Sequence, residues 1–499
     1  MRLGEHKFSF YKSLLFDNAL DFSGRSSFMK EIMLEKIYPT RIILPMKQHY
    51  GSPCIPVVKK GDHVLIGQCV GMPPEGSLGA PVHSGISGNV TDIRQIELPD
   101  TTKCEAVFIS SDRKRTHHPS IRPRSDFNVS ATNVTGMIKE AGIVGMGGEG
   151  IPTWAKITRA RKSGVDCILV NCLQSEPYAT SDLLRITDYA DYLIMGAVAL
   201  AGAVGVTTIE FLISEKKTTE ITALQSAMER TQGRYSGYAF NIRYFKERFP
   251  QGYYRLVAKA LWDKNLEPGQ TLEETCKAVM FNCSTVYACW EAIADGMPLV
   301  SRIITVTGND NDGHNVLAPI GTPVSEILNS INGRSETMDR IILGNALTGI
   351  ALKDPDNIPV MKTTPAVTVI RDMEGVSSHC MHCGSCSRAC PMEIYPSVLK
   401  QLIDRGMNEK AENEGIGKCI ACGACSYVCP SRIDLTSTIA GYVASTAKRT
   451  PASFTSAVIN ESIDIGSVSL LERYNEEEED KTSDDKDTIL LPFEGGKRV

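Results

Sequence analysis

The sequence predicts a multidomain protein that combines α/β and α+β parts. The chain has 499 residues, too many for one hydrophobic core, so three or four domains are expected. Residues 133–308 alternate between helical and strand-like patterns, which is typical of a parallel α/β sheet. Half of the 16 cysteines lie in one short region near the C-terminus with the spacing of metal ligands.

The composition is typical of a globular protein and argues against nucleic acid as a partner. Hydrophobic residues make up 42% of the chain and the formal net charge is −5, whereas a nucleic-acid-binding domain shows a basic surface. No secretory signal is recognised, so we expect a cytoplasmic protein with reduced thiols. Eight scattered cysteines are then interpreted as ordinary core thiols: Cys54, Cys69, Cys104, Cys167, Cys172, Cys276, Cys283 and Cys289.

One stretch imitates a membrane span. Residues 192–213 are largely apolar and long enough to cross a bilayer, but Gly202, Gly205 and the pair Thr207 and Thr208 interrupt them. We interpret the stretch as a buried helix that ends near Gly205, followed by a strand buried on both faces. The chain is then expected to have no transmembrane segment of its own, although it can dock onto a membrane partner.

The N-terminal part predicts a small β-sandwich or barrel. Residues 1–37 form a leader without clear periodicity. In the next assigned domain, residues 38–100, short strands alternate with Gly, Pro and Asp turns, one of them a hairpin turn at residues 60–62.

The middle of the chain predicts an α/β domain at residues 130–308 and a small α+β module at residues 309–365. The elements expected in the first are helices 132–141 and 183–204 and strands 167–170, 207–213 and 300–307, the last closing the domain. The second contains a strand at residues 340–343. The tail, residues 446–499, has acidic runs at residues 476–480 and 484–485. It predicts a solvated, disordered segment, with an electrostatic docking arm as the alternative.

Two cysteine motifs with the same spacing lie in residues 374–445. Their members are Cys380, Cys383, Cys386, Cys390 and Pro391 in the first, and Cys419, Cys422, Cys425, Cys429 and Pro430 in the second. The pattern is that of bacterial ferredoxins, in which three cysteines hold one [4Fe–4S] cluster and the fourth ligates the other cluster. A structural zinc site would need only four of these cysteines, so we expect two clusters.

On this rule the two motifs exchange their fourth ligand. One cluster takes Cys380, Cys383, Cys386 and Cys429, and the other takes Cys419, Cys422, Cys425 and Cys390. Gly384 and Gly423 allow the backbone to approach the sulfides, and His379 and His382 are expected to be exposed neighbours rather than ligands. Because clusters pass single electrons, a donor that delivers electrons in pairs needs a flavin in between.

A glycine-rich loop offers a phosphate site. Between residues 142 and 156 the glycines expose backbone N–H groups ahead of a helix N-terminus, and a lysine can add a point charge. The residues concerned are Gly145, Gly147, Gly148, Gly150 and Lys156. A plain turn between helices is the alternative interpretation. Asn282 and Thr285 follow a short apolar strand, and residues 170–177 follow another, so these segments are expected to converge where α/β sheets bind ligands.

With these motifs in place, the chain resembles the C subunit of the Rnf electron-transport complex, whose flavin domain is similar to the NADH-oxidising subunit of respiratory complex I. The resemblance runs in order over residues 38–445. It includes LPMKQHYGSPCIPVVKKGDHVLIGQ, APVHSGISGNV, GMGGEGIPTWAK, VNCLQSEPYATSD, RFPQG, FNCSTVYA, PLVSRIITVTG, APIGTPV and both cysteine motifs. It implies a barrel-sandwich (lipoyl-like) domain, an FMN domain, a β-grasp ligand-binding module and a two-cluster domain, in the order given above. No lysine occupies the Pro81–Gly88 hairpin, so no lipoyl or biotinyl attachment is expected.

The resemblance also implies FMN in the glycine-rich domain, with Asn171 and Glu176 kept from the family motif, and electron exchange with NAD(H). Three departures concern the nicotinamide side. Glu149 and Ile151 replace a small residue and a phenylalanine of the family loop, and one acidic residue of the Asn171–Pro177 motif is lost. Tyr253 also stands where a second glycine is expected. NADH use is therefore the least secure part of the implied function.

Two functions follow. The first is a flavin/iron–sulfur oxidoreductase subunit that passes electrons between NAD(H) and a redox protein partner. It would act either peripherally on the cytoplasmic membrane face, with the other subunits of a membrane complex, or as a paralogue in a soluble reductase. The second is an electron-relay and docking protein with two [4Fe–4S] clusters and no nucleotide chemistry. No Ser–His–acid arrangement is recognised in the sequence, and no catalytic residue is assigned.

Overall fold

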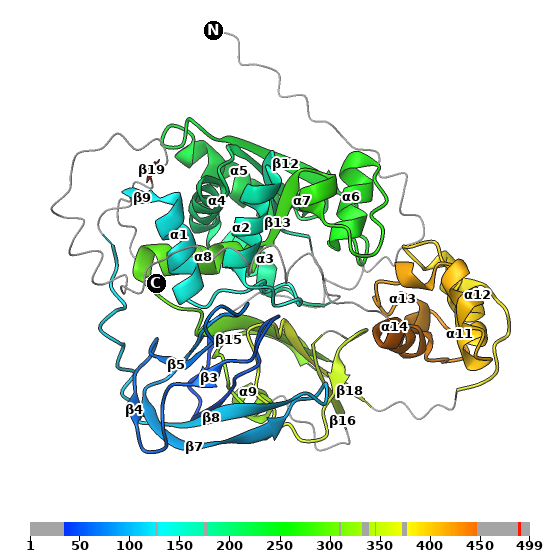
Figure 1. Ribbon diagram of the computed structural model, residues 1–499, viewed down its shortest axis with the longest axis horizontal. Helices are drawn as coiled ribbons and strands as arrows, with labels where there is room; N and C mark the ends of the chain where they lie inside the picture. Colours follow the sequence, from blue (N-terminus) through cyan, green and yellow to red (C-terminus); the bar gives the residue numbers. More distant parts are fainter. Residues whose placement is uncertain are drawn as a thin grey trace, which may run out of the picture.

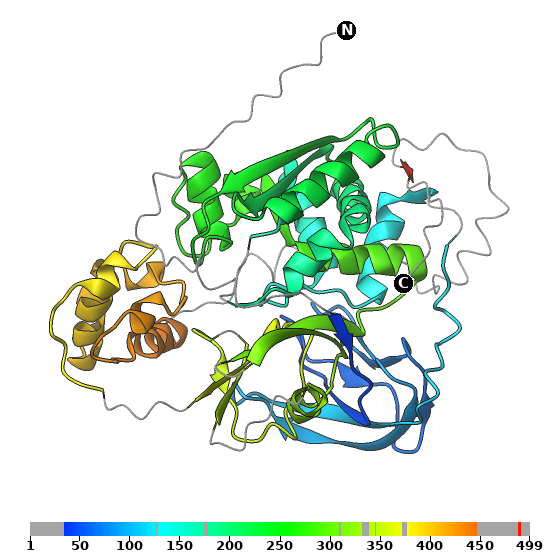
Figure 2. The ribbon, with the colours of Figure 1, turned by 180° about the vertical axis from the view of Figure 1, so that it is seen from behind.

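The computed structural model describes residues 34–124, 128–173, 178–308, 311–331, 339–344, 346–371, 377–446 and 488–490. Within these ranges the strands form a six-stranded, two four-stranded, a three-stranded and a two-stranded sheet. Figure 1 and the reverse view in Figure 2 show the helix-covered parallel sheet beside the β-rich parts, with the cysteine-rich helices as a separate lobe. The expected multidomain α/β and α+β fold class is confirmed.

The N-terminal β domain consists of two antiparallel sheets, in the orders β2-β8-β7-β4 and β3-β5-β6. Its strands are β2 (Arg41–Pro45), β3 (Ile55–Pro56), β4 (His63–Val64), β5 (Cys69–Met72), β6 (Val82–His83), β7 (Gly88–Glu97) and β8 (Lys103–Ser111). The predicted turn is present, because the Asp62 N–H donates to the Lys59 carbonyl at 3.1 Å. β8 pairs with both β2 and β7, so the sheet continues past residue 100.

The α/β domain is built on a parallel sheet in the order β12-β11-β10-β13. Its strands are β10 (Cys167–Asn171), β11 (Thr208–Ser214), β12 (Ala239–Phe245) and β13 (Ala278–Asn282). Its helices are α1 (Ala131–Glu140), α2 (Thr153–Ser163), α3 (Ser181–Thr187), α4 (Ala190–Val204), α5 (Thr218–Thr231), α6 (Tyr254–Trp262), α7 (Leu272–Thr275) and α8 (Cys283–Asp295). Alternate strand residues enter two different cores, one shared with α1, α4 and α8 and the other with α6, so the sheet is covered on both faces.

The apolar stretch at residues 192–213 has the predicted structure. α4 ends at Gly205, whose φ of 89° forms a left-handed cap that only glycine adopts without strain, and β11 follows in the centre of the sheet. Among the described residues, no helix combines the length and apolarity that crossing a membrane requires.

The single helix expected at residues 183–204 is wrong, because two helices, α3 and α4, occupy it. Tyr189 leaves the helical conformation, with φ −128° and ψ 28°. The Thr187 hydroxyl contacts the Asp188 carboxylate at 2.9 Å, and short polar side chains of this kind compete with helical backbone bonding. The Tyr189 ring then packs edge-on against Tyr287 of α8, 5.2 Å between centroids.

The strand expected at residues 300–307 does not close the α/β sheet. β14 (Ser301–Gly308) instead pairs antiparallel with β15 (Asn311–Pro319) and parallel with β18 (Ala366–Arg371). Their sheet has the order β1-β15-β14-β18-β16-β17 and includes β1 (Leu34–Lys36) from the leader, β16 (Asp339–Leu343) and β17 (Ile350–Ala351). Helix α9 (Val324–Ser330) packs on this sheet in a core of its own. The expected strand at residues 340–343 is confirmed as β16.

A buried polar network joins this sheet to the α/β domain. The Thr305 hydroxyl of β14 accepts from the N–H groups of Thr180 and Ser181 at 2.9 and 3.0 Å, and itself donates to Asn315 at 2.8 Å. The Asn315 amide in turn donates to the Thr180 hydroxyl at 2.9 Å. Because all these groups are buried and mutually satisfied, the network fixes the start of α3 against the neighbouring sheet.

The cysteine-rich lobe contains short helices around its own core. They are α10 (Ser385–Arg388), α11 (Pro396–Asp404), α12 (Asn408–Asn413), η2 (Ile416–Lys418), α13 (Ala424–Tyr427) and α14 (Leu435–Thr446). Of the tail, only β19 (Thr488–Leu490) is described, and it pairs antiparallel with β9 (Asn128–Ser130). These three residues are an exception to the expected disordered tail, because their apolar side chains favour a strand. The acidic runs lie outside the described residues.

Candidate functional site

The glycine-rich loop lies at the carboxyl edge of the parallel sheet. The Met146 N–H donates to the Thr285 hydroxyl at 2.9 Å, and a Cβ on Gly147 would lie 3.6 Å from Asn282. Asn282 ends β13 and caps α8, accepting from the Ser284 N–H at 3.0 Å. The predicted convergence of the loop with Asn282 and Thr285 is therefore present.

The glycines of the loop divide into two kinds. The Gly145 N–H donates to the Ile151 carbonyl at 2.8 Å and the Gly150 N–H donates to the Gly145 carbonyl at 3.2 Å, so these two shape the loop. Gly147, Gly148 and Glu149 are exposed, and in the described part of the chain no partner is seen for their N–H groups. Three successive free N–H groups form a concave donor surface for an anion such as a phosphate.

Lys156 lies one turn into α2, which follows the loop. Its ammonium is 5.5 Å from the centre of the Phe281 ring of β13. Burial lowers the pKa of Lys156, while the Glu273 and Glu149 carboxylates act in the opposite direction. Glu273 also forms a 2.6 Å ion pair with Arg159 of α2, both side chains being largely buried. A cation beside the donor surface suits an anionic ligand.

The predicted polar side chains are already paired within the protein. Asn171 donates to the Gly252 carbonyl at 3.0 Å and accepts from the Leu173 N–H at 3.1 Å. The Asn282 amide donates to the Asp182 carboxylate at 2.9 Å. These asparagines therefore shape the strand ends. Glu176 lies outside the described residues.

Two polar residues at this edge were missed by the sequence analysis. Asp182 accepts hydrogen bonds from Asn282 and from the Ser284 hydroxyl, although no motif singles it out. Gln251 is 3% exposed and neither its amide nitrogen nor its oxygen has a partner among the described residues. Because a buried carboxamide without partners is costly, Gln251 fits a site that a polar ligand completes. Its place in the RFPQG segment was the available signal.

The two cysteine motifs repeat the same backbone with an offset of 39 residues. Gly384 and Gly423 begin α10 and α13 with φ 72° and 84°, which confirms that the motifs need glycine there. His382 and Ala421 both have positive φ, and so do Glu393 and Arg432. The following helices α11 and α14 begin at equivalent positions, residues 396 and 435. His379 and His382 are exposed, as expected.

One expected set of four thiols lies together. Burial raises the pKa of Cys390 to about 11, and the neighbouring Cys419 and Cys425 thiols act in the same direction. The pKa of Cys422 is raised to about 12 chiefly by burial, with Cys390, Cys425 and Cys419 as neighbours, so the pKa of both thiols reflects crowding. Crowded thiols of this kind fit iron, whose positive charge favours the thiolate. Cys383 of the other set is exposed.

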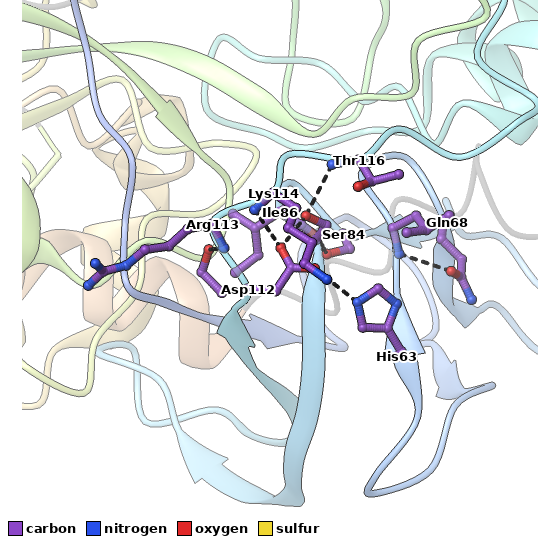
Figure 3. A network of polar contacts seen from close by, with 11 residues as sticks. His63, Gln68, Ser84, Ile86, Asp112, Arg113, Lys114 and Thr116 are labelled. Carbon is purple, nitrogen blue, oxygen red and sulfur yellow. Dashed lines mark hydrogen bonds and ion pairs between the residues drawn. The ribbon is translucent and has the colours of Figure 1, made fainter.

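A serine, a histidine and an aspartate also meet in the N-terminal β domain (Figure 3). The Ser87 hydroxyl donates to one Asp112 oxygen at 2.6 Å, and His63 Nε2 lies 2.9 Å from the other oxygen. The carboxylate thus stands between the two side chains, and the imidazole does not face the hydroxyl. These bonds, led by the one from Ser87, lower the pKa of Asp112 to about 2. The arrangement is a clasp rather than a nucleophile with its base.

Three family models match successive parts of the chain. They are the RnfC barrel sandwich hybrid domain at residues 25–114, the Nuo51 FMN-binding domain at residues 138–291 and the 4Fe-4S dicluster domain at residues 373–430. The chain therefore carries FMN-type and [4Fe–4S]-type electron-transfer domains in one polypeptide. One solved structure, an NAD+-reducing [NiFe]-hydrogenase in the H2-reduced state, aligns with a TM-score of 0.48 and 15% identity, over 63% of this chain and 61% of that chain.

Relatives match most of the chain, and each is the C subunit of a redox complex. That of the Na(+)-translocating ferredoxin:NAD(+) oxidoreductase complex of Acetobacterium woodii is 32% identical, over 75% of this chain and 84% of the relative. That of the proton-translocating ferredoxin:NAD(+) oxidoreductase complex of Clostridium ljungdahlii is 30% identical, over 75% and 81%. That of the ion-translocating oxidoreductase complex of Rhodobacter capsulatus is 31% identical, over 76% and 72%. The chain belongs to the RnfC family, the flavin and iron–sulfur electron-transfer subunits of a multisubunit oxidoreductase.

Proposed function

We propose that the chain passes electrons between NAD(H) and a redox protein partner, as a peripheral subunit of a membrane complex. The support is the activity that its relatives are named for, ferredoxin:NAD(+) oxidoreductase, together with the two kinds of electron-transfer domain. A bound flavin exchanges electrons in pairs or singly, whereas a cluster carries one. The combination suits a subunit that joins a two-electron nucleotide to one-electron carriers.

The observation that carries the flavin site is the exposed donor surface at the carboxyl edge. We assign the phosphate to the N–H groups of Gly147, Gly148 and Glu149, beside Lys156. Gly145 and Gly150 hold the loop in shape through their hydrogen bonds. Asn171, Asn282 and Thr285 hold the strand ends and the loop together. Gln251 would donate to and accept from polar atoms of the cofactor.

The departures from the family loop weigh less against nucleotide use than the sequence suggested. Ile151 packs against Leu78, Trp154 and Ala155, in the small cluster that joins the loop to the β domain. Its replacement of phenylalanine therefore changes a contact in the interior. Glu149 is exposed within the donor surface, and its negative charge weakens the attraction for an anion there. We expect NAD(H) to be used with a raised KM.

Anaerobic mixing with NADH separates this function from a pure electron relay. The full-length protein, loaded with flavin and clusters, is mixed with NADH in a stopped-flow spectrometer. Rapid bleaching of the flavin and cluster absorbance is expected, and Glu149→Ala should lower the NADH concentration needed for half-maximal rate. Intact absorbance over many seconds would instead favour the relay and docking protein.

Cofactor content tests the domains independently of NADH. Two cubane clusters require about eight irons per chain. Anaerobically purified protein should contain that amount, with one extractable FMN. Fewer than about six irons would contradict the assignment of all eight cysteines. Co-sedimentation with membrane vesicles from the source cells, lost after a high-salt wash, is the result expected for peripheral membrane association.

A further inference from the structure

Two of the scattered cysteines meet at the carboxyl edge of the parallel sheet. β10 and β13 are neighbours, and their last residues, Asn171 and Asn282, are register partners. Cys172 and Cys283 follow these residues directly. Their side chains are 3% and 0% exposed and lie in the same core, on the face that contains α3, α4 and α8. The sequence analysis interpreted them only as separate core thiols.

The strand register gives this pair the spacing of a disulfide. Neighbouring strands are about 4.8 Å apart, and the Cα atoms of bridged cysteines are about 4.4–6.8 Å apart. Side chains at equivalent positions of paired strands point to the same face of the sheet. Cys172 keeps the strand hydrogen bond, its N–H donating to the Leu212 carbonyl at 2.9 Å, so the alignment extends to this residue.

The two thiols interact directly. The Cys283 thiol is a hydrogen-bonding partner of the Cys172 thiol, and its sulfur lies 3.9 Å from the Asp182 carbonyl. The Cys172 thiol, burial and the nearby Asp182 carboxylate raise the pKa of Cys283 well above its ordinary value. Cys283 therefore keeps its proton and Cys172 is the sulfur that accepts it, which gives the two cysteines different roles. In thiol–disulfide exchange the sulfur that loses its proton attacks first.

We propose that Cys172 and Cys283 form a reversible disulfide, a redox centre in addition to the flavin and the clusters. Oxidation breaks two S–H bonds, forms one S–S bond and releases two protons and two electrons. A small-molecule disulfide accepts them by becoming two thiols. In the loaded protein an oxidised flavin could accept the same pair, and this clause alone rests on the proposed function.

The disulfide would act on the flavin edge through the residues that precede the cysteines. Asn171 holds the loop at Gly252, and Asn282 caps α8 and binds Asp182. A bond between the next residues fixes the spacing of the two strand ends. The oxidised and reduced proteins should therefore bind FMN with different affinity.

Peptide mapping of the full-length protein, with its clusters in place, tests the pair. Samples are equilibrated anaerobically with graded ratios of oxidised to reduced dithiothreitol, approached from both directions, then quenched in acid and alkylated in denaturant. The expected product is a peptide pair cross-linked between Cys172 and Cys283, lost again on the reducing side. Recovery of both residues as alkylated thiols at every ratio overturns the proposal.

Matched variants separate the pair from general thiol oxidation. Cys172→Ser and Cys283→Ser should each abolish the cross-link. Cys289→Ser should leave it unchanged, because Cys289 is equally buried in α8 and burial is the sole influence on its raised pKa. A cross-link that persists in Cys172→Ser, or that disappears in Cys289→Ser, contradicts the assignment.

Flavin-stripped protein distinguishes this proposal from the flavin assignment. A Cys172–Cys283 bond that forms there with dithiothreitol supports the redox pair even if no FMN can be rebound. Conversely, protein that rebinds FMN but never forms the bond overturns the redox pair and leaves the flavin site intact.

Discussion

Lys362 shows how much one buried residue can determine. It is 1% exposed, and its ammonium donates to the Pro81 carbonyl of the β domain at 2.6 Å and to the Gly142 carbonyl before the glycine-rich loop at 2.7 Å. Burial lowers its pKa to about 8. The side chain thus links three parts of the protein at the cost of burying a charge.

The effect of Lys362 on stability should depend on pH. The unfolded chain holds the lysine proton up to about pH 10.5, while the folded protein releases it near pH 8. The free energy of unfolding contributed by this group therefore rises between pH 8 and pH 10.5. Near pH 7, Lys362→Met should be less stable by roughly 1–3 kcal/mol, because two buried carbonyls lose their donor.

Urea unfolding of both proteins at pH 7, 8, 9 and 10 measures this difference. The wild-type advantage over Lys362→Met should grow across the series, because neutral lysine still donates to both carbonyls. A constant difference would show that the lysine is not buried as a charge. Comparison at each pH cancels the titration of cysteines and tyrosines that both proteins share.

Two buried histidines predict sensitivity to acid. Burial lowers the pKa of His83 to about 3 and that of His49 to about 4, with Lys362 acting in the same direction. Their stabilising contribution is complete above pH 6.5 and is lost as the pH falls toward these values, because the unfolded chain binds protons first. His83→Gln should remove about 1.4 kcal/mol per pH unit from the slope of stability below pH 6. The exposed His117→Gln should leave the slope unchanged in the same acid titration.

At the scale of the element, the glycine-rich loop contains a matched pair of positions. Gly148 has φ 117°, which strains any other residue, although a Cβ there would meet nothing within 4 Å. Gly147 needs no positive φ, and its Cβ would make an ordinary contact with Asn282. Gly148→Ala should therefore weaken FMN binding by about tenfold, from roughly 1–2 kcal/mol of strain. Gly147→Ala should bind FMN nearly as the wild type does in a fluorescence titration.

The equivalent glycines of the cysteine motifs differ in their surroundings. A Cβ on Gly423 would lie 2.6 Å from the Leu347 carbonyl oxygen, whereas a Cβ on Gly384 meets only the flexible Arg388 side chain at 3.2 Å. Both have positive φ, so the strain of an alanine is shared. Gly423→Ala should lower the melting temperature more than Gly384→Ala, because only the first pushes the lobe away from the turn at residues 346–348. Equal losses would mean that this contact contributes little.

Over the whole molecule, the sequence predicted the parts better than their arrangement. Periodicity and turn residues located most helices and strands, and spacing identified the cluster cysteines, because these signals are local. The sheet that β14 joins was not predictable, since pairing with β15 and β18 is decided by distant contacts. The same holds for Asp182 and Lys362, whose roles depend on groups from other segments. Asn282 and Thr285 were placed correctly at the edge, but their hydrogen bonds were visible only in the structure.

The 39-residue repeat of the cysteine lobe has a consequence for how the protein is made. If each half supplies three ligands to one cluster and one ligand to the other, neither cluster is complete until both halves have been synthesised and brought together. Iron loading and folding of the lobe then become a single cooperative event. A chain that stops after the first motif would be left without either cluster, rather than with one.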